Sequence, residues 1–162
     1  MQENNSGEVY IVSACLIGLD SRYNGKNKEN MLVRSMLSQG ILIPICPEQI
    51  GGLCTPRPPA EIVGGSGLDV LESRALVMNS DGEDVTASYL KGAFQVLRLA
   101  RMMDCRKAIM KENSPSCGVN AIFDGCFNGT LRSGQGVTTA LLVKEGIDVA
   151  SEHDLGTTSV WD

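Results

Sequence analysis

Residues 109–118 read IMKENSPSCG, an apolar start that turns abruptly into a polar loop. Residues 107–110 predict a short buried strand, and residues 111–118 predict the loop at its carboxyl end. The loop holds Cys117 between Ser116 and Gly118. The carboxyl end of a strand is where open α/β sheets bind ligands. This stretch therefore predicts a fold class and the place of a site within it.

Two other stretches have the same layout. Residues 9–12 run into Cys15, and residues 41–45 run into Cys46. If the three strands lie parallel in one sheet, their carboxyl ends share one edge and their cysteines face one crevice. Free cysteines are also common as small buried apolar residues. Position alone therefore leaves a shared cysteine site and simple packing equally open.

Strand and helix patterns alternate along the chain. Helical spacing predicts helices at residues 31–38, from Asp84 or Thr86 to about Met103, and at 137–145. The long middle helix carries an apolar stripe of Leu90, Ala93, Phe94, Leu97 and Ala100. Further patterns predict strands at 75–78 and 147–150, a proline-stiffened loop at 55–60, a plain glycine loop at 64–67 and a small hairpin at 121–131. We therefore expect an α/β fold with a mostly parallel β-sheet flanked by helices in Rossmann-like layers, plus a small β-hairpin insertion.

Length, net charge and composition limit the classes of protein to which the chain can belong. The 162 residues favour one domain, for which we predict residues 8–155, with a disordered tail at 1–7 and a weakly ordered one at 156–162. The net charge is −5 and only 4% of residues are aromatic, so binding of nucleic acid is not expected. The sequence has neither a signal-peptide pattern nor an apolar run of membrane-spanning length. We expect a cytoplasmic protein that does not bind membranes.

Longer motifs carry a family resemblance. The stretches VSACLIG, RYNGK, ICPEQIGGLCTPRPPAEIVGG, KENSPSCG and GVTTALL follow one another between residues 9 and 155. In that order they resemble the family of domain of unknown function 523, whose characterised members are thiouracil desulfidases. The resemblance covers nearly the whole chain and implies an enzyme that replaces the sulfur of a thiolated pyrimidine with oxygen.

The resemblance also implies a cofactor and its ligands. In the family three cysteines hold a [4Fe–4S] cluster and leave one iron open, and the matching positions here are Cys15, Cys46 and Cys117. Thiolates are the usual protein ligands of such clusters, and an open iron can bind a thiocarbonyl sulfur. Glu48 matches the family's catalytic glutamate, which could deprotonate water, and Ser114 matches a catalytic serine. A cluster with an open iron is expected to be lost in air, so aerobically prepared protein would lack it.

Other polar residues of these loops are candidates for binding substrate. We assign this role to Arg57, Lys111, Ser116 and Ser13, and Arg22 is a further candidate anchor. Four residues of the site also have a simpler interpretation: Glu48 as a surface carboxylate paired with Arg57, Ser114 and Ser116 as turn-forming residues, and Lys111 as a solvated side chain. His153, the only histidine, is expected at the surface. Packing or incidental roles are expected for Cys54, Cys105 and Cys126.

Alternative functions remain open at this point. A zinc-dependent hydrolase could use the same three thiolates, because zinc binds thiolate and keeps an open position in catalytic sites. A non-catalytic protein that carries sulfide or a cluster would not need Glu48 and Ser114. The expected substrate is small, thiolated tRNA is less favoured, and a sulfide acceptor is a further candidate partner. The sequence does not assign an oligomeric state.

Overall fold

A computed structural model describes residues 7–156 and residue 161, and its centre is one parallel sheet. The sheet has four strands in the order β2-β1-β5-β8. Their bounds are Ile41–Ile45 for β2, Val9–Ser13 for β1, Lys107–Met110 for β5 and Asp148–Ser151 for β8. The neighbouring strands pair in parallel, so the predicted arrangement of the three cysteine-bearing segments is confirmed.

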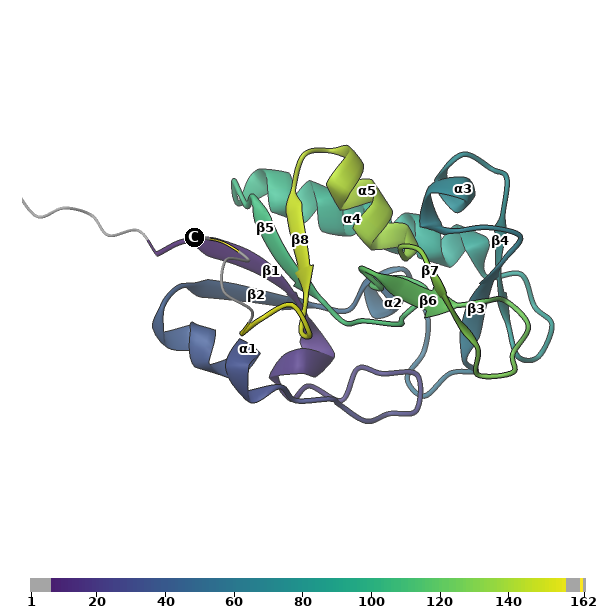
Figure 1. Cartoon of the computed structure of the whole chain (residues 1–162), viewed down its shortest axis with the longest axis horizontal. Coiled ribbons are helices and arrows are strands. Elements are labelled where there is room, and N and C mark those ends of the chain that lie inside the picture. The colour runs from purple at the N-terminus through teal and green to yellow at the C-terminus, as the bar shows by residue number, and fades with distance from the viewer. Residues whose placement is uncertain (1–6, 157–160, 162) are drawn as a thin grey trace, which may run out of the picture.

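Helices cover both faces of this sheet (Figure 1). Ile11, Ala108 and Met110 belong to the core beneath α4 (Thr86–Met102) and α5 (Val137–Lys144). Val12 and Ile109 point to the other face, where they pack with the 3-10 helix η1 (Ala14–Ile17) and with α1 (Met31–Ser35). A helix was predicted at 31–38. Its first five residues form the α-helix α1, and the last three form the 3-10 helix η2 (Met36–Ser38). The layered α/β fold that the sequence predicts is confirmed.

The long helix α4 follows the predicted stripe with one exception. Ala93, Leu97 and Ala100 are buried, as expected, but the ring of Phe94 is 55% exposed. Phe94 directly follows Ala93, and a rotation of about 100° per residue carries it away from the buried face. Tyr89 and Val96 complete that face instead.

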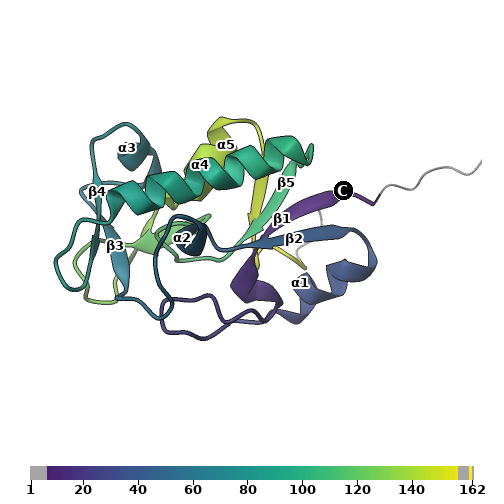
Figure 2. The same cartoon turned by 180° about the vertical axis from the view of Figure 1, so that it is seen from behind.

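Two short antiparallel sheets form the other half of the molecule. In one, β3 (Ala60–Val63) pairs with β4 (Leu76–Asn79), with α3 (Gly67–Leu71) between them. In the other, β6 (Ala121–Phe123) pairs with β7 (Leu131–Ser133), which confirms the predicted hairpin. Figure 2 shows α4 running the length of the molecule, from the β3–β4 end to the parallel sheet. We call the four-stranded sheet with η1 and α1 the sheet half, and β3, β4, α3, β6 and β7 the hairpin half.

Several short elements were not predicted. They are β3, α3 and the single-turn helix α2 (Pro47–Ile50), and the predicted loop at 55–60 ends one residue early because Ala60 begins β3. The glycine loop before α3 is a plain loop, as expected: Ser66 and Asp69 form a capping box that starts the helix. No described helix has both the length and the apolar character needed to cross a membrane. The predicted tails lie largely outside the described residues.

Candidate active site

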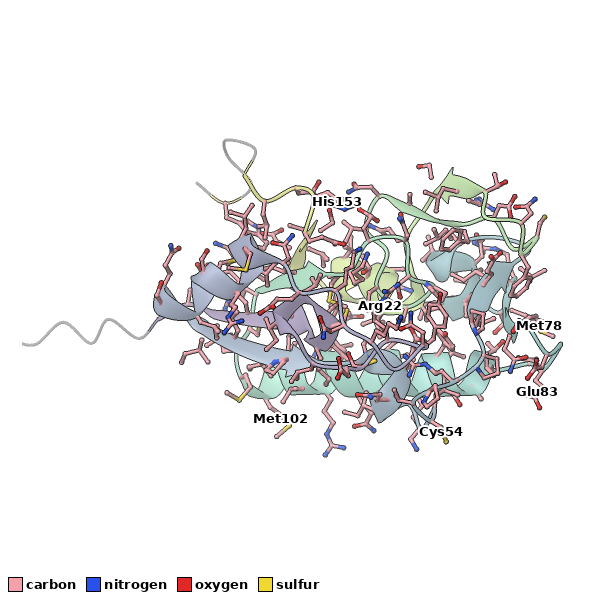
Figure 3. The ribbon with its side chains drawn as sticks, turned by 90° about the horizontal axis from the view of Figure 1, so that it is seen from below. Arg22, Cys54, Met78, Glu83, Met102 and His153 are labelled. Carbon is pink, nitrogen blue, oxygen red and sulfur yellow. The ribbon has the colours of Figure 1, made fainter. Side chains whose placement is uncertain are left out.

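A cavity of about 410 Å³ lies at the carboxyl ends of β1, β2 and β5. Its lining includes all nine residues assigned to the site from the sequence: Ser13, Cys15, Cys46, Glu48, Arg57, Lys111, Ser114, Ser116 and Cys117. Arg22 lines it too, and Figure 3 shows Arg22 near the middle of the molecule, whereas Met78 and Glu83 lie at the far end of the hairpin half. The edge predicted from strand ends is therefore a real concave site.

The three predicted cysteine ligands reach the cavity from separate elements. Cys15 lies in η1 directly after β1, Cys46 is the N-cap of α2 directly after β2, and Cys117 lies in the turn that follows β5. All three are free thiols; Cys15 and Cys117 are buried and Cys46 is half-buried. Segments that lie far apart in sequence thus bring three sulfur ligands to one cavity.

Burial keeps these thiols protonated while no metal compensates their charge. It raises the pKa of Cys15 to about 11 and that of Cys117 to about 12. Burial also raises the pKa of Cys46, although the backbone amide of Gln49 opposes the shift. Metal binding needs thiolates, so loading of the site must release protons and become more favourable as the pH rises.

The cysteine loop, residues 111–118, is fixed by the buried carboxylate of Glu112, a role that was not predicted from the sequence. Oε1 of Glu112 accepts hydrogen bonds from the backbone amides of Val119, Asn120 and Ala121 at 2.8 to 3.1 Å. Burial disfavours the charge of Glu112, but these amides outweigh it and lower the pKa of the carboxyl. The carboxylate therefore fixes the chain just beyond Cys117.

The start of α5 holds the same loop from the side. Backbone amides of Val137 and Thr138 donate to the carbonyls of Pro115 and Ser116, both at 2.9 Å, and Thr139 Oγ1 donates to the Cys117 carbonyl at 2.8 Å. The first amides of a helix have no partner within the helix, so the loop carbonyls satisfy them. The contact explains why GVTT accompanies SPSCG in the sequence.

Close approach at this junction requires glycine. A Cβ atom on Gly136 would lie 2.5 Å from the backbone carbon of Ser116 and 2.7 Å from the Cys117 amide nitrogen. Any larger residue would push the cysteine loop away from α5.

The carboxylate of Glu48 accepts hydrogen bonds from three side chains that line the cavity. Its Oε1 accepts from Arg57 Nε at 3.0 Å and from the Tyr89 hydroxyl at 2.9 Å, and its Oε2 accepts from Ser116 Oγ at 2.8 Å. The Glu48 side chain is only 12% exposed, so the pairing with Arg57 exists but is not a surface ion pair. A fixed carboxylate beside three cysteines is placed to handle a proton in the cavity.

Arg57 is committed to the protein through every one of its N–H donors. Nη1 donates to the Cys54 carbonyl and to Thr55 Oγ1, and Nη2 donates to the Ser21 carbonyl at 2.9 Å and approaches Cys46 Sγ at 3.8 Å. With Nε on Glu48, no donor of the guanidinium remains for a ligand. The geometry favours a role in positioning Glu48 and Cys46 over direct binding of substrate.

The two serines divide their tasks differently from the expectation. Ser114 Oγ accepts the backbone amides of Ser116 and Cys117 at 3.2 and 3.1 Å, which shapes the turn around the cysteine. Ser116, which was assigned to substrate binding with the turn as its simpler interpretation, donates to Glu48 and lies 3.0 Å from Ser114 Oγ. A continuous path of hydroxyls therefore joins Ser114 to the carboxylate of Glu48.

Lys111 and Ser13 also have partners within the protein. Lys111 Nζ lies 2.8 Å from Glu152 Oε1 and donates to the Glu112 carbonyl at 2.9 Å. Ser13 Oγ accepts the Lys111 amide at 2.9 Å, which ties the ends of β1 and β5 together. The interpretation of Lys111 as a solvated side chain is wrong, because only 16% of its side chain is exposed.

Tyr89 is a site residue that could have been predicted from the helical spacing of the sequence but was not. It lies on the buried face of α4, where its ring is 2% exposed, one position before the first residue of the predicted stripe. A buried tyrosine needs a partner for its hydroxyl, and Glu48 supplies it. Burial, and then the charge of Glu48, raise the pKa of Tyr89 well above its ordinary value, so the hydroxyl stays a donor.

The remaining cysteines and the histidine stay outside the cavity lining. Cys54 and Cys126 are exposed, and Cys105 is buried with its thiol directed at the carbonyls of Val9 and Lys107. His153 is 65% exposed in its side chain, as predicted. These positions supply natural controls for the site.

The donor set fits an iron–sulfur cluster. Cys15, Cys46 and Cys117 line one cavity and come from separate segments of the chain. Thiolates are the usual protein ligands of iron–sulfur clusters, and three of them leave one iron of a four-iron cluster without a protein ligand. Among the residues that the structure describes, no group of three His, Cys, Asp or Glu side chains is arranged to hold a single metal ion.

The fold and the cysteine cavity define a class of protein. A family model described as 2-thiouracil desulfurase matches residues 10–154, and the chain belongs to this family. The family resemblance seen in the sequence is thereby confirmed.

Particular relatives agree with this membership. The chain is 44% identical over 145 residues to the uncharacterised protein YbbK of Bacillus subtilis (strain 168). The aligned region covers 90% of this chain and 96% of YbbK. It is also similar to the solved structure of TudS, a [4Fe–4S]-dependent thiouracil desulfidase. That match has a TM-score of 0.80 and 42% identity, and covers 91% of this chain and 93% of TudS.

Proposed function

We propose that the chain is a [4Fe–4S]-dependent desulfidase that converts a thiolated pyrimidine of the thiouracil type to the uracil-like product and sulfide. The observation that carries the proposal is the meeting of Cys15, Cys46 and Cys117 beside Glu48 in one cavity. Membership of the 2-thiouracil desulfurase family and likeness to TudS support it. The zinc hydrolase finds no such support.

Three cysteines would hold the cluster. When bound, the cluster supplies an iron without a protein ligand, a Lewis acid with affinity for the sulfur of the substrate. The reaction exchanges sulfur for oxygen: water adds its oxygen to the ring carbon, the C–S bond breaks, and sulfur leaves as sulfide. No electrons are gained or lost by the substrate, so no external reductant is needed.

Glu48 would act as the general base. Its carboxylate accepts a proton from the water that attacks the ring carbon, while Tyr89, Ser116 and Arg57 hold it in place. Ser114 would sit at the end of the hydroxyl path, where it can pass a proton to or from the substrate through Ser116. We further propose that Lys111 and Ser13 keep β1 and β5 in register beneath the site.

The substrate would be a small molecule handled in the cytoplasm. A net charge of −5 opposes binding of a polyanion such as tRNA. Six free thiols agree with a reducing compartment.

Turnover by the cluster-loaded chain tests the proposal. After anaerobic reconstitution, incubation with 2-thiouracil should give equal amounts of uracil and sulfide. Glu48→Gln should lower kcat by about 10² to 10³ with an unchanged iron content, because it removes the base and keeps the cysteines. A loaded wild-type chain that forms no uracil would favour the cluster-carrier alternative.

A further inference from the structure

One aromatic ring of the cavity lining has no task in the chemistry described above. Phe127 lies between β6 and β7 in the hairpin half and lines the cavity, whereas the three cysteines reach it from the ends of the parallel strands. Phe127 is 42% exposed. Among the residues that the structure describes, its ring takes part in no aromatic or cation–π contact. An apolar ring that stays half-exposed inside a ligand cavity is available for contact with a ligand.

The other aromatic residues of the lining are less available. Tyr89 is buried with its hydroxyl on Glu48. Tyr23 is 39% exposed, but the guanidinium of Arg22 lies over one face of its ring, 5.7 Å from the centroid. Phe123 is partly buried within β6. Phe127 is thus the lining ring with the most open surface.

The backbone of Phe127 is fixed. Its φ is 54°, in the left-handed region that a residue with a bulky side chain seldom adopts. Its amide donates to Glu61 Oε2 at 3.0 Å, and the amide of Gly125 donates to the same oxygen at 2.9 Å. The backbone that carries the ring is therefore held in place before any ligand arrives.

Glu61 is built into the wall behind this loop. The residue is 8% exposed on β3, and two backbone amides are its hydrogen-bond donors among the described residues. A Cβ atom on Gly125 would lie 2.5 Å from the Ile62 carbonyl oxygen, so the loop is pressed against β3. A buried carboxylate is costly unless its hydrogen bonds are made, and here those bonds fix the position of one aromatic residue.

We propose that Phe127 is the platform on which the ring of the substrate stacks, and that Glu61 is its positioning residue. The inference rests on the proposed function, because it takes the ligand to be a flat heteroaromatic ring. Phe127 contacts the face of that ring, while the cysteines and Glu48 act at its edge. We therefore expect a preference for pyrimidines over open-chain thioamides, which have no ring to stack.

Equilibrium binding tests the inference without turnover. The dissociation constants of uracil, 2-thiouracil and thiourea are measured by calorimetry on the cluster-loaded Glu48→Gln background, in which turnover of 2-thiouracil is suppressed. Phe127→Ala should weaken binding of both ring compounds by about tenfold, the order expected for lost stacking. Thiourea, which carries sulfur but no ring, should bind as before. Phe127→Tyr should restore the affinity for both rings.

Matched variants separate stacking from damage to the fold. Phe94→Ala removes another exposed phenylalanine, which lies outside the cavity, and should change no dissociation constant. Glu61→Ala should weaken ring binding like Phe127→Ala, and the double variant should be no weaker than either single one, because both act through the same ring.

The failures can be told apart. Unchanged uracil affinity in Phe127→Ala, or an equal loss for thiourea, would overturn the inference. A wild-type chain that binds uracil but forms none from 2-thiouracil would overturn the proposed function alone.

Discussion

The sheet half and the hairpin half reach the same cavity by different physical means. In the sheet half, parallel strands end at one edge and deliver Cys15, Cys46 and Cys117 through backbone topology. In the hairpin half, no strand exceeds four residues, and the lining is positioned by individual side chains such as Glu61 and by close glycine contacts. The first mechanism leaves a periodic signal in the sequence, whereas the second leaves almost none.

The largest effect is expected at the junction between the start of α5 and the loop that carries Cys117, which the sheet delivers to the cavity. Gly136→Ala should lower the free energy of unfolding by about 3 kcal/mol, because its Cβ would overlap the backbone of Ser116. The displaced loop should also lose cluster, measured as iron per chain.

Gly82→Ala provides the matched control. Gly82 has a φ of 80°, and a Cβ there would meet nothing within 4 Å, so only the conformational cost of about 1 kcal/mol applies. Equal losses for the two variants, or full iron content in Gly136→Ala, would contradict the role of the junction.

The next effect concerns the carboxylate below the cysteine loop. Glu112→Gln should lower the free energy of unfolding by about 2 kcal/mol at pH 7, since a charged acceptor of several amides is lost. Denaturant midpoints of the loaded proteins measure it.

The pH dependence of this effect has a definite sign. The folded-state pKa of Glu112 lies below its ordinary value of 4.5, so its contribution is complete above that value and is lost as the pH falls through the lowered pKa. The difference in midpoint between wild type and Glu112→Gln should therefore shrink below about pH 4.5. A constant difference would contradict the ionised state assigned here.

A smaller effect is expected for the buried hydroxyl on Glu48. Tyr89→Phe should lower kcat by about tenfold and leave the iron content unchanged, because one donor to the base is removed while the ring stays packed. Steady-state kinetics with 2-thiouracil measure it. An unchanged kcat would mean that Arg57 and Ser116 suffice to hold Glu48.

The smallest effect belongs to the hairpin half. Ser66→Ala removes one arm of the capping box at α3 and should lower the free energy of unfolding by about 1 kcal/mol, seen as a lower denaturant midpoint. Iron content and kcat should not change. Loss of iron in this variant would contradict the view that the sheet half positions the cysteines independently of the hairpin half.

This contrast explains what could be predicted from the sequence. Buried strands that end in cysteine predicted the parallel sheet and its binding edge, because the 2.0 and 3.6 periods and strand polarity are local signals. The three candidate ligands came from the family resemblance, since position alone left simple packing equally open. The roles of Glu112, Tyr89 and Glu61 depend on partners 7 to 66 residues away, and no local pattern encodes such distances. The five protein partners of the Arg57 guanidinium likewise become visible only when the chain is folded.

The central claim is that Cys15, Cys46 and Cys117 hold one cluster. Iron and acid-labile sulfide per chain, measured after anaerobic reconstitution, test it most directly. About four of each are expected for wild type and for the controls Cys54→Ala and Cys126→Ala, and far less for Cys15→Ala, Cys46→Ala or Cys117→Ala. About one zinc per chain without sulfide, or equal losses in both sets of variants, would contradict the account.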